Sequence, residues 1–239
     1  MDEFQDKLLK IIHQSGFPFQ IGIRKEIDRI DREHGWTVTA EEYHWSRGGK
    51  SGFIDFIVEV EDGRFWYSLV VECKRVTAKD PKGPGPSLIF LRPSENTTVH
   101  DRVSGFKVDR VRDNLAEPKM NLDKTYWIDE TACLPATVET SYCVFEAQEE
   151  KNPMIERIAD SLLPSVEAAA SDWLTHTGPS NSESRVFIPV VVTNATLYTG
   201  TFDASLVDMS DGKMPSGEFQ AQPFVRFRKG LIQPKSGLS

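Results

Sequence analysis

Two strongly apolar, strand-like runs joined by an Asp-Gly pair constrain this chain more than any other feature. The sequence GFIDFIVEVEDGRFWYSLVVECKRV, residues 52–76, is rich in β-branched and aromatic residues on both sides of Asp62 and Gly63. An Asp-Gly pair between such runs is the strongest short signal for a β-hairpin. We therefore predict a hairpin in which this pair forms the loop and Glu61 lies opposite Arg64.

The predicted hairpin carries three charged side chains among its apolar ones. Asp55 lies in the first run, and Glu72 and Lys74 lie in the second. The predicted register places Asp55 opposite Val70, so these two residues share a face of the sheet. Side chains alternate along a strand, so Glu72 and Lys74 lie on that face too. We expect the two acids and the lysine to form one patch; the alternative is an exposed Glu72–Lys74 ion pair on a solvated face.

Two amphipathic helices are predicted ahead of the hairpin. The first is EFQDKLLKIIHQ, residues 3–14, whose apolar side chains recur at helical spacing. The second is expected from about Phe19 to His34 and has one apolar stripe. Glu26 lies at the edge of this stripe, about 55° from its centre, where a carboxylate is unexpected. Its alternative role is a rim salt bridge, for example with Lys25 or Arg29.

A weaker strand and a long irregular segment flank the hairpin. Residues 36–45, WTVTAEEYHW, alternate weakly and favour a first strand, and RGGKSG follows it as a loop. Residues 76 to about 138 predict a loop-rich insertion. Within residues 75–124, ten Lys or Arg stand against seven acids. This locally basic segment is either a solvated loop region or a rim that faces phosphates.

A strand, a helix and a strand are predicted in that order towards the C-terminus. TSYCVFEA is β-rich, and Asn152-Pro153 is a good cap and first turn for the next helix. Pro164 is expected to kink or split that helix. RVFIPVVVTNA predicts a strand covered on both faces, in which Pro189 indicates an edge or a bulge. This order predicts a parallel pair joined by a right-handed crossover, and so an α/β fold with a central mixed β-sheet flanked by helices.

The composition favours a soluble, cytoplasmic protein. The chain has 239 residues, 39% hydrophobic and 27% charged, and no apolar run approaches the roughly 20 residues that a membrane helix needs. Its first residues are polar and acidic, unlike a secretory signal. Its three cysteines form no metal-binding pair and suggest no disulfide framework. The net charge is −8, so binding to nucleic acid needs a local basic patch or a partner.

The patch on the hairpin suits a hard divalent cation such as Mg²⁺ or Mn²⁺, which takes oxygen ligands. Asp55 and Glu72 would supply two carboxylate oxygens, and the backbone carbonyl of Cys73 would supply a third. Such a cation lowers the pKa of a bound water and stabilises charge on a phosphoryl oxygen. Lys74 would orient the water or hold the phosphate. Glu26 would bind a second metal ion or position a water.

This arrangement resembles the PD-(D/E)xK superfamily of restriction-endonuclease-like nucleases. The residues that carry the resemblance are Glu26 on the leading helix, Asp55 in Gly-Phe-Ile-Asp-Phe, and Glu72-Cys73-Lys74 on the next strand. The resemblance covers about residues 15–75 and 140–200, and the order of the elements agrees with it. One departure is Ile54, which stands at the place of the motif's proline, a residue that many members lack.

The resemblance implies one nuclease domain over residues 1–239, with a restriction-endonuclease-like core at about 15–75 and 140–200 and an insertion at about 76–138. It implies hydrolysis of nucleic-acid phosphodiester bonds, with Mg²⁺ or Mn²⁺ bound by the Asp and the Glu and assisted by the Lys. DNA is the favoured substrate. The predicted nucleic-acid contacts are Arg47, Lys50 and Arg75.

The chain also resembles, more loosely, the small stand-alone nucleases of bacterial anti-phage defence systems. In such a setting, targeting would come from a homo-oligomer or from a partner such as an ATPase or helicase subunit. Two alternatives stay open. One is a non-catalytic, nuclease-like module for nucleic-acid binding or assembly, which would have no need of a divalent ion. The other is an RNA-directed nuclease of the same fold.

Overall fold

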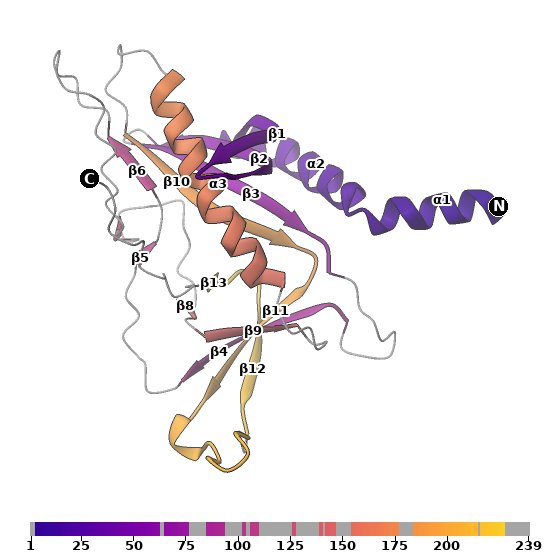
Figure 1. Ribbon diagram of the computed structural model, residues 1–239, viewed down its shortest axis with the longest axis vertical. Coiled ribbons are helices and arrows are strands. Elements are labelled where there is room, and N and C mark those ends of the chain that lie inside the picture. Colours follow the sequence, from indigo (N-terminus) through magenta and orange to yellow (C-terminus); the bar gives the residue numbers. More distant parts are fainter. Residues whose placement is uncertain are drawn as a thin grey trace. The chain divides into compact units, whose positions relative to one another are not determined.

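The computed structural model describes residues 3–62, 65–76, 85–93, 102–103, 106–109, 126–127, 139–140, 142–146, 154–176, 184–214 and 216–227. The chain divides into two compact units. The first consists of Met1–Arg75, Arg102–Glu130 and Asp160–Thr193, and the second of Val76–Asp101, Thr131–Ala159 and Asn194–Ser239. The fold is α/β, as predicted, with mixed sheets and helices (Figure 1). The interpretation of residues 1–239 as one domain stays a prediction.

Two helices open the first unit, close to where the sequence predicts them. Helix α1 spans Glu3–Gln14 and α2 spans Phe17–His34. Gly16 lies between them with a φ of 77°, a left-handed conformation that glycine adopts at little cost. Pro18 lies in the first turn of α2, where its missing N–H is not needed. Helix α2 therefore begins two residues earlier than expected.

A mixed five-stranded sheet forms the centre of the first unit (Figure 1). Its order is β1-β2-β3-β10-β6, and β10 runs parallel to β3 while the other neighbours are antiparallel. The strands are β1 (Thr37–Arg47), β2 (Lys50–Asp62), β3 (Phe65–Lys74), β10 (Ser184–Thr193) and β6 (Phe106–Asp109).

The segment RGGKSG, predicted as a loop, is mostly strand. Only Gly48 and Gly49 separate β1 from β2, and Arg47 pairs with Lys50 across them. Both glycines have positive φ, 58° and 77°, as a two-residue type I′ hairpin turn requires. The turn keeps the two strands paired almost to their ends.

The β2–β3 hairpin is confirmed, but its predicted register is wrong by two residues. Asp62 is still paired, with Phe65, so only residues 63 and 64 separate the two strands. The Asp-Gly signal locates the turn but does not fix which two residues occupy it. The two strands make further apolar pairs, such as Val58 with Leu69, in the register that they adopt.

This shift changes the neighbours of the charged residues but not their face. A register change of two residues keeps every side chain on its predicted side of the sheet. Phe56 pairs with Val71, and continuing that register by one residue places Asp55 opposite Glu72. The predicted pairing of Asp55 with Val70 is therefore wrong, and Asp55 lies closer to Glu72 than predicted.

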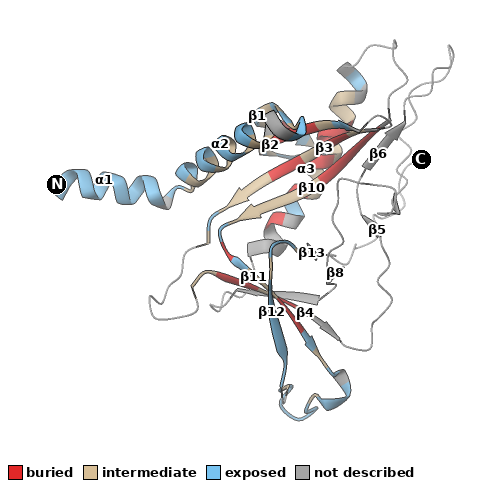
Figure 2. Ribbon diagram, turned by 180° about the vertical axis from the view of Figure 1, so that it is seen from behind, coloured by how far each residue is buried: buried red, intermediate tan, exposed pale blue. Residues whose placement is uncertain are grey.

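Apolar packing holds α2 against the sheet. Phe56, Val58 and Val71 form a buried cluster, against which Ile23 and Ile27 of α2 pack. Figure 2 shows the burial concentrated on the strands of this sheet, while α1 is exposed along its length. Within the described residues, no helix is long and apolar enough to cross a membrane.

Strand β10 is confirmed, and the position of its proline has a simple reason. β6 pairs only with residues 184–187 of β10. β3 pairs with nearly all of β10, from Arg185 to Thr193. Pro189 lies beyond the stretch that β6 covers, on a part of β10 that is an edge within the described residues. A missing backbone N–H is tolerated there.

The predicted partner of β10 is wrong. The segment TSYCVFEA contains β9 (Tyr142–Glu146), but β9 belongs to the sheet of the second unit and pairs with β4 (Ser87–Pro93). That sheet has the order β12-β11-β4-β9, with β11 (Thr196–Phe202) parallel to β4 and β12 (Glu218–Gln222) antiparallel to β11. Residues 87–93, expected within an irregular insertion, are therefore a strand.

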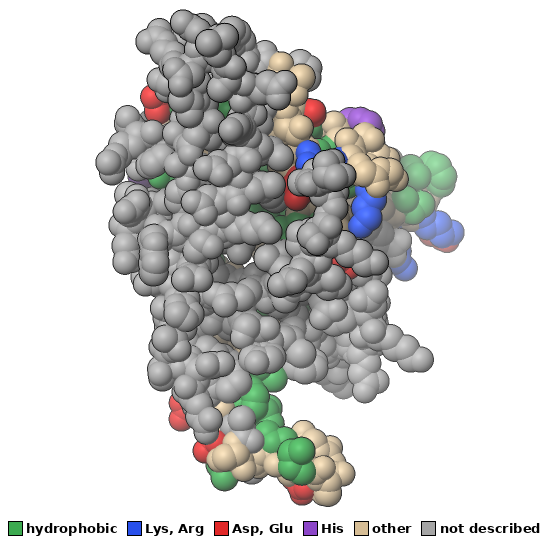
Figure 3. Space-filling view, turned by 60° about the vertical axis from the view of Figure 1, so that its left-hand side comes forward, with side chains coloured by type: hydrophobic (Ala, Val, Ile, Leu, Met, Phe, Trp, Pro, Cys, Tyr) green, Lys and Arg blue, Asp and Glu red, His purple; other side chains and the backbone are tan. Residues whose placement is uncertain are grey.

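The second unit has its own small core and an exposed tip. Leu88, Phe90 and Ala195 form its buried cluster. The connection from β11 to β12 includes the short helix η2 (Ala204–Leu206) and exposes hydrophobic side chains, seen in green at the bottom of Figure 3. The short strands β5 (Arg102–Val103) and β7 (Tyr126–Trp127) of the first unit pair with each other, as do β8 (Glu139–Thr140) and β13 (Arg226–Phe227) of the second.

Helix α3 spans Met154–His176 and contains Pro164 without being split. Most of the basic segment at residues 75–124 lies outside the described residues.

Candidate functional site

The hairpin brings three of the predicted site residues together where β2 and β3 approach the end of their pairing. One carboxylate oxygen of Asp55, Oδ2, accepts a hydrogen bond of 2.6 Å from the backbone N–H of Cys73. On β3, the Lys74 ammonium lies 2.6 Å from Oε1 of Glu72. All three side chains are half-buried. The carboxylates therefore lie between water and the protein interior, where a bound cation would compensate their charge.

The Asp55 carboxyl carries the clearest electrostatic signature of the site. Its pKa is raised from 3.8 to about 6, chiefly because burial removes water from the charged form. The Cys73 N–H opposes this shift, the negative charge of Glu72 adds to it, Lys74 opposes it, and Glu42 adds to it. Asp55 thus lies among acids that its lysine neighbour compensates only in part.

Cys73 contributes through its backbone and not through its thiol. Burial, followed by the charges of Asp55 and Glu72, raises the pKa of the thiol to about 12, so the reactive thiolate is disfavoured. The N–H of Cys73 points to Asp55. Because the N–H and C=O of a strand residue point to the same side, its carbonyl lies on that side too. The carbonyl as a metal ligand stays a prediction.

Glu42 is an acid of this site that the sequence reasoning missed. It lies on β1 between the pairs Glu41–Phe56 and Tyr43–Ile54, and so opposite Asp55. Its φ is 49°, the one positive value among the described non-glycine residues. The available signal was a break in alternation, because the apolar residues of WTVTAEEYHW change phase at the Glu-Glu pair.

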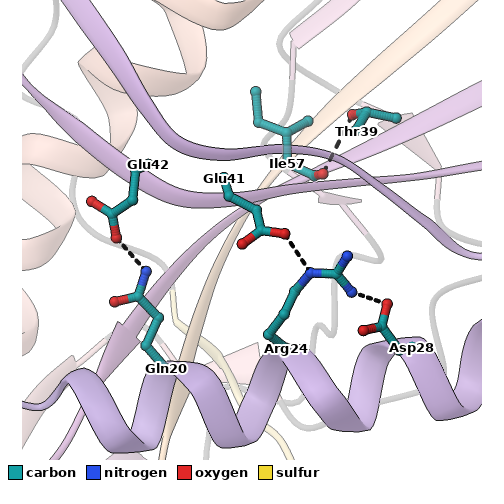
Figure 4. Close-up of polar contacts among 7 residues, drawn as sticks. All are labelled: Gln20, Arg24, Asp28, Thr39, Glu41, Glu42 and Ile57. Carbon is teal, nitrogen blue, oxygen red and sulfur yellow. Dashed lines mark hydrogen bonds and ion pairs between the residues drawn. The ribbon is translucent and has the colours of Figure 1, made fainter.

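Helix α2 holds this irregular part of β1 in place. The amide of Gln20 donates a hydrogen bond to Glu42, and Nε of Arg24 lies 2.6 Å from Oε1 of Glu41 (Figure 4). Arg24 also pairs with Asp28, one turn further along α2. Gln20 of α2 therefore contacts the site through Glu42.

Glu26, the residue of α2 that was predicted to belong to the site, does not lie at the patch of Asp55, Glu72 and Lys74. Its side chain is 61% exposed, and it lies 2.9 Å from Nε of Arg29, three residues along α2. This is the rim salt bridge that was its alternative. The site acid that α2 contacts is Glu42 of β1, whose backbone has a positive φ.

The predicted nucleic-acid contacts differ in their surroundings. Arg47 pairs with Glu167 of α3, with Nε and Oε2 3.1 Å apart. Arg75 donates a hydrogen bond to the backbone carbonyl of His13. Lys50 is exposed beside the β1–β2 turn. A protein group thus already binds each arginine, whereas the lysine side chain extends into solvent.

The donor set fits a hard cation by its chemistry. Carboxylate oxygens are the ligands that Mg²⁺ and Mn²⁺ prefer, and Asp55, Glu72 and Glu42 supply them from three adjacent strands. Within the described residues, no three His, Cys, Asp or Glu side chains are already arranged around a metal position. The oxygens of Glu72 and Asp55 instead face Lys74 and the Cys73 N–H. A cation would have to compete with these contacts.

Comparison of the chain with family models, with curated proteins and with solved structures finds no match.

Proposed function

We propose that this protein is a metal-dependent nuclease that hydrolyses phosphodiester bonds of nucleic acid, with DNA as the favoured substrate. One observation carries the proposal: the Asp55 carboxylate, with its pKa raised to about 6, lies beside Glu72 and Lys74 on adjacent strands. Two acids and a lysine in this order along a hairpin are the set on which the resemblance to PD-(D/E)xK nucleases rests.

Each residue has a role that its surroundings support. Asp55 and Glu72 would hold Mg²⁺ or Mn²⁺, together with the Cys73 carbonyl. When bound, the cation supplies positive charge that stabilises a phosphoryl oxygen and lowers the pKa of water. Lys74, released from its ion pair with Glu72, would orient the attacking water and hold the phosphate. Glu26 is left out of the proposed site because it lies with Arg29 on the exposed side of α2.

The arrangement of elements supports a restriction-endonuclease-like core in the first unit. Helix α2, the strands β1, β2 and β3, helix α3 and strand β10 come in this order along the chain. The strand that the resemblance implies ahead of α3, β9, belongs instead to the sheet of the second unit. The parallel β3–β10 pair places the strand with Glu72 and Lys74 inside the sheet and not at its edge.

The charge of the chain bears on its partners. A net charge of −8 opposes binding to a polyanion. We therefore include in the proposal a partner that supplies targeting, either a second copy or an ATPase or helicase subunit of an anti-phage defence system, and a cytoplasmic location.

A plasmid assay with a matched control tests the proposal. The purified chain and Lys74→Ala are incubated with supercoiled plasmid and Mg²⁺, Mn²⁺ or EDTA. Lys213→Ala is the control, because Lys213 also pairs with an acid two residues before it, Asp211, but lies in the second unit. We expect metal-dependent nicking or linearisation that falls by about 10²–10⁴-fold in Lys74→Ala and is unchanged in Lys213→Ala.

An absence of cleavage is resolved by calorimetry and by a second substrate. Mg²⁺ and Mn²⁺ are titrated into the chain and into Asp55→Ala, and labelled RNA replaces the plasmid. Metal binding that disappears in Asp55→Ala supports a nuclease that needs a partner or an RNA substrate. No metal binding to the unsubstituted chain would overturn the catalytic proposal and favour the non-catalytic module.

A further inference from the structure

Strand β2 exposes a large aromatic ring close to the site. The Phe53 side chain is 59% exposed, although the next residue, Ile54, is completely buried. A single exposed apolar side chain is ordinary on a protein surface. Phe53 differs by its place, because it lies two residues before Asp55, which puts their Cα atoms about 7 Å apart along the strand.

The Phe53 ring has a defined partner on the neighbouring strand. His44 of β1 pairs with Phe53, and their ring centres lie 5.2 Å apart with an angle of 63° between the ring planes. Edge-to-face contact of this kind is a preferred geometry for aromatic side chains. His44 is itself exposed. One residue pair separates these two rings from Glu42 and Asp55, so the rings lie in water beside two acids of the site.

A cation lies on the other side of the ring along the same strand. Lys50 is exposed and stands three residues before Phe53, about 10 Å away along β2. The order along β2 is therefore a cation, an aromatic ring and a site acid. Proteins that bind single-stranded nucleic acid combine cations that follow the phosphates with aromatic side chains on which bases stack.

We propose that Phe53 stacks against an unpaired base next to the phosphate that is cleaved, so that the substrate of this site is DNA in single-stranded form. The proposal rests on the nuclease function proposed above and narrows its substrate. A base inside a duplex is stacked between its neighbours and has to leave the stack before a side chain can reach its face. Negative supercoiling favours opening of the duplex, so a supercoiled plasmid also offers unpaired bases.

Binding in EDTA measures stacking apart from cleavage. Anisotropy is recorded for a labelled thymidine oligonucleotide and for an abasic oligonucleotide of the same length, which carries the same phosphates without bases. We expect the full chain to prefer the thymidine strand. Phe53→Ala should bind that strand about 5- to 150-fold more weakly and bind the abasic strand as before.

Three further variants and one further strand complete the experiment. Phe53→Trp should keep the preference for bases because it keeps an aromatic face, whereas Phe53→Leu, which is apolar but not aromatic, should lose most of it. Phe4→Ala on α1 is the matched control, since the Phe4 side chain is 64% exposed, and should bind like the unsubstituted chain. A uridine oligonucleotide of the same length distinguishes DNA from RNA as the source of the base.

The results for stacking and for cleavage are separable. Equal affinity of the unsubstituted chain for the thymidine and abasic strands would overturn the stacking role, even in a chain that cleaves plasmid. Unchanged binding of the thymidine strand by Phe53→Ala would overturn it too. A preference for bases that Phe53→Ala removes, in a chain that binds no metal ion, would support the stacking role and contradict the nuclease.

Discussion

At the scale of single residues, the Asp55 carboxyl determines how the site responds to pH. Its pKa lies at about 6 in the folded chain, against an ordinary value of 3.8. The folded state therefore holds this proton more tightly than the unfolded chain does, and ionising Asp55 costs folding free energy. The cost is absent below pH 3.8, grows as the pH rises and is complete above about pH 6. A bound cation would remove it, since the positive charge favours the ionised form.

Replacing Asp55 by asparagine should accordingly stabilise the metal-free protein above pH 6. The amide of Asp55→Asn keeps an oxygen that can accept the Cys73 N–H but carries no charge near Glu72 and Glu42. We expect its melting temperature to exceed that of the unsubstituted chain above pH 6, and the difference to shrink as the pH falls towards 3.8. Thermal unfolding in EDTA across this range measures it.

Asp203→Asn is a control with the opposite sign. Hydrogen bonds from Ser205 lower the pKa of Asp203, so this carboxylate favours folding at neutral pH and loses that effect in acid. A melting temperature of Asp55→Asn below that of the unsubstituted chain at neutral pH would contradict the assigned environment of Asp55.

The site residues show what the sequence could and could not predict at this scale. Asp55, Glu72 and Lys74 were correctly predicted to share one face of the hairpin. Side chains alternate with a period of two residues, so an error of two residues in the register leaves every side chain on its predicted face. Glu42 was missed because its place opposite Asp55 depends on the pairing of β1 with β2 and on an irregular backbone at Glu42, neither of which a local pattern predicts. Glu26 was favoured because helical periodicity gives the face of a side chain but not which strand residue it reaches.

At the scale of elements, a buried ion pair joins β10 to the hairpin. Arg185 on β10 pairs with Glu59 on β2, and Ser68 on β3 donates a hydrogen bond of 2.6 Å to the same carboxylate. The guanidinium carbon lies 5.2 Å from the ring centre of Trp66 and 4.8 Å from that of Trp173 on α3. Three strands and a helix thus meet at one buried charge.

Breaking this pair from one side should destabilise the first unit strongly. Glu59→Leu leaves the Arg185 charge buried without its partner, and such a change costs about 3–5 kcal/mol. The double variant Glu59→Leu/Arg185→Met removes both charges and should regain most of that loss. Urea unfolding of the single and double variants gives the coupling energy. Equal stability of Glu59→Leu and the unsubstituted chain would show that the pair does not hold β10 in place.

The helices and strands themselves were predicted better than the pairing between strands. α1, the hairpin and β10 follow from local periodicity, which a short window of sequence contains. The pairing of β9 with β4, and of β10 with β3, joins segments far apart in the chain, and local patterns carry no information about it. The crossover rule applies only when both strands belong to one sheet, and β9 and β10 do not.

At the scale of the whole molecule, the net charge of −8 means that the proposed binding to nucleic acid would depend on a few exposed cations. Lys50 extends into solvent, whereas Arg47 and Arg75 are bound to Glu167 and to the His13 carbonyl. Of the three predicted contacts, Lys50 is therefore the one that can reach a phosphate without first breaking an internal contact.

The salt dependence of binding separates these roles. Each phosphate contact adds about 0.9 to the slope of log affinity against log salt for duplex DNA. We expect Lys50→Ala to reduce that slope by about this amount without changing the melting temperature. Arg47→Ala should leave the slope nearly unchanged and lower the melting temperature, because it removes the link from β1 to Glu167. Anisotropy of a labelled duplex, titrated in EDTA so that no cleavage interferes, gives the slopes. If Arg47→Ala reduced the slope and Lys50→Ala did not, the arginine would have to leave Glu167 when DNA binds, and the β1–α3 contact would be part of the binding surface.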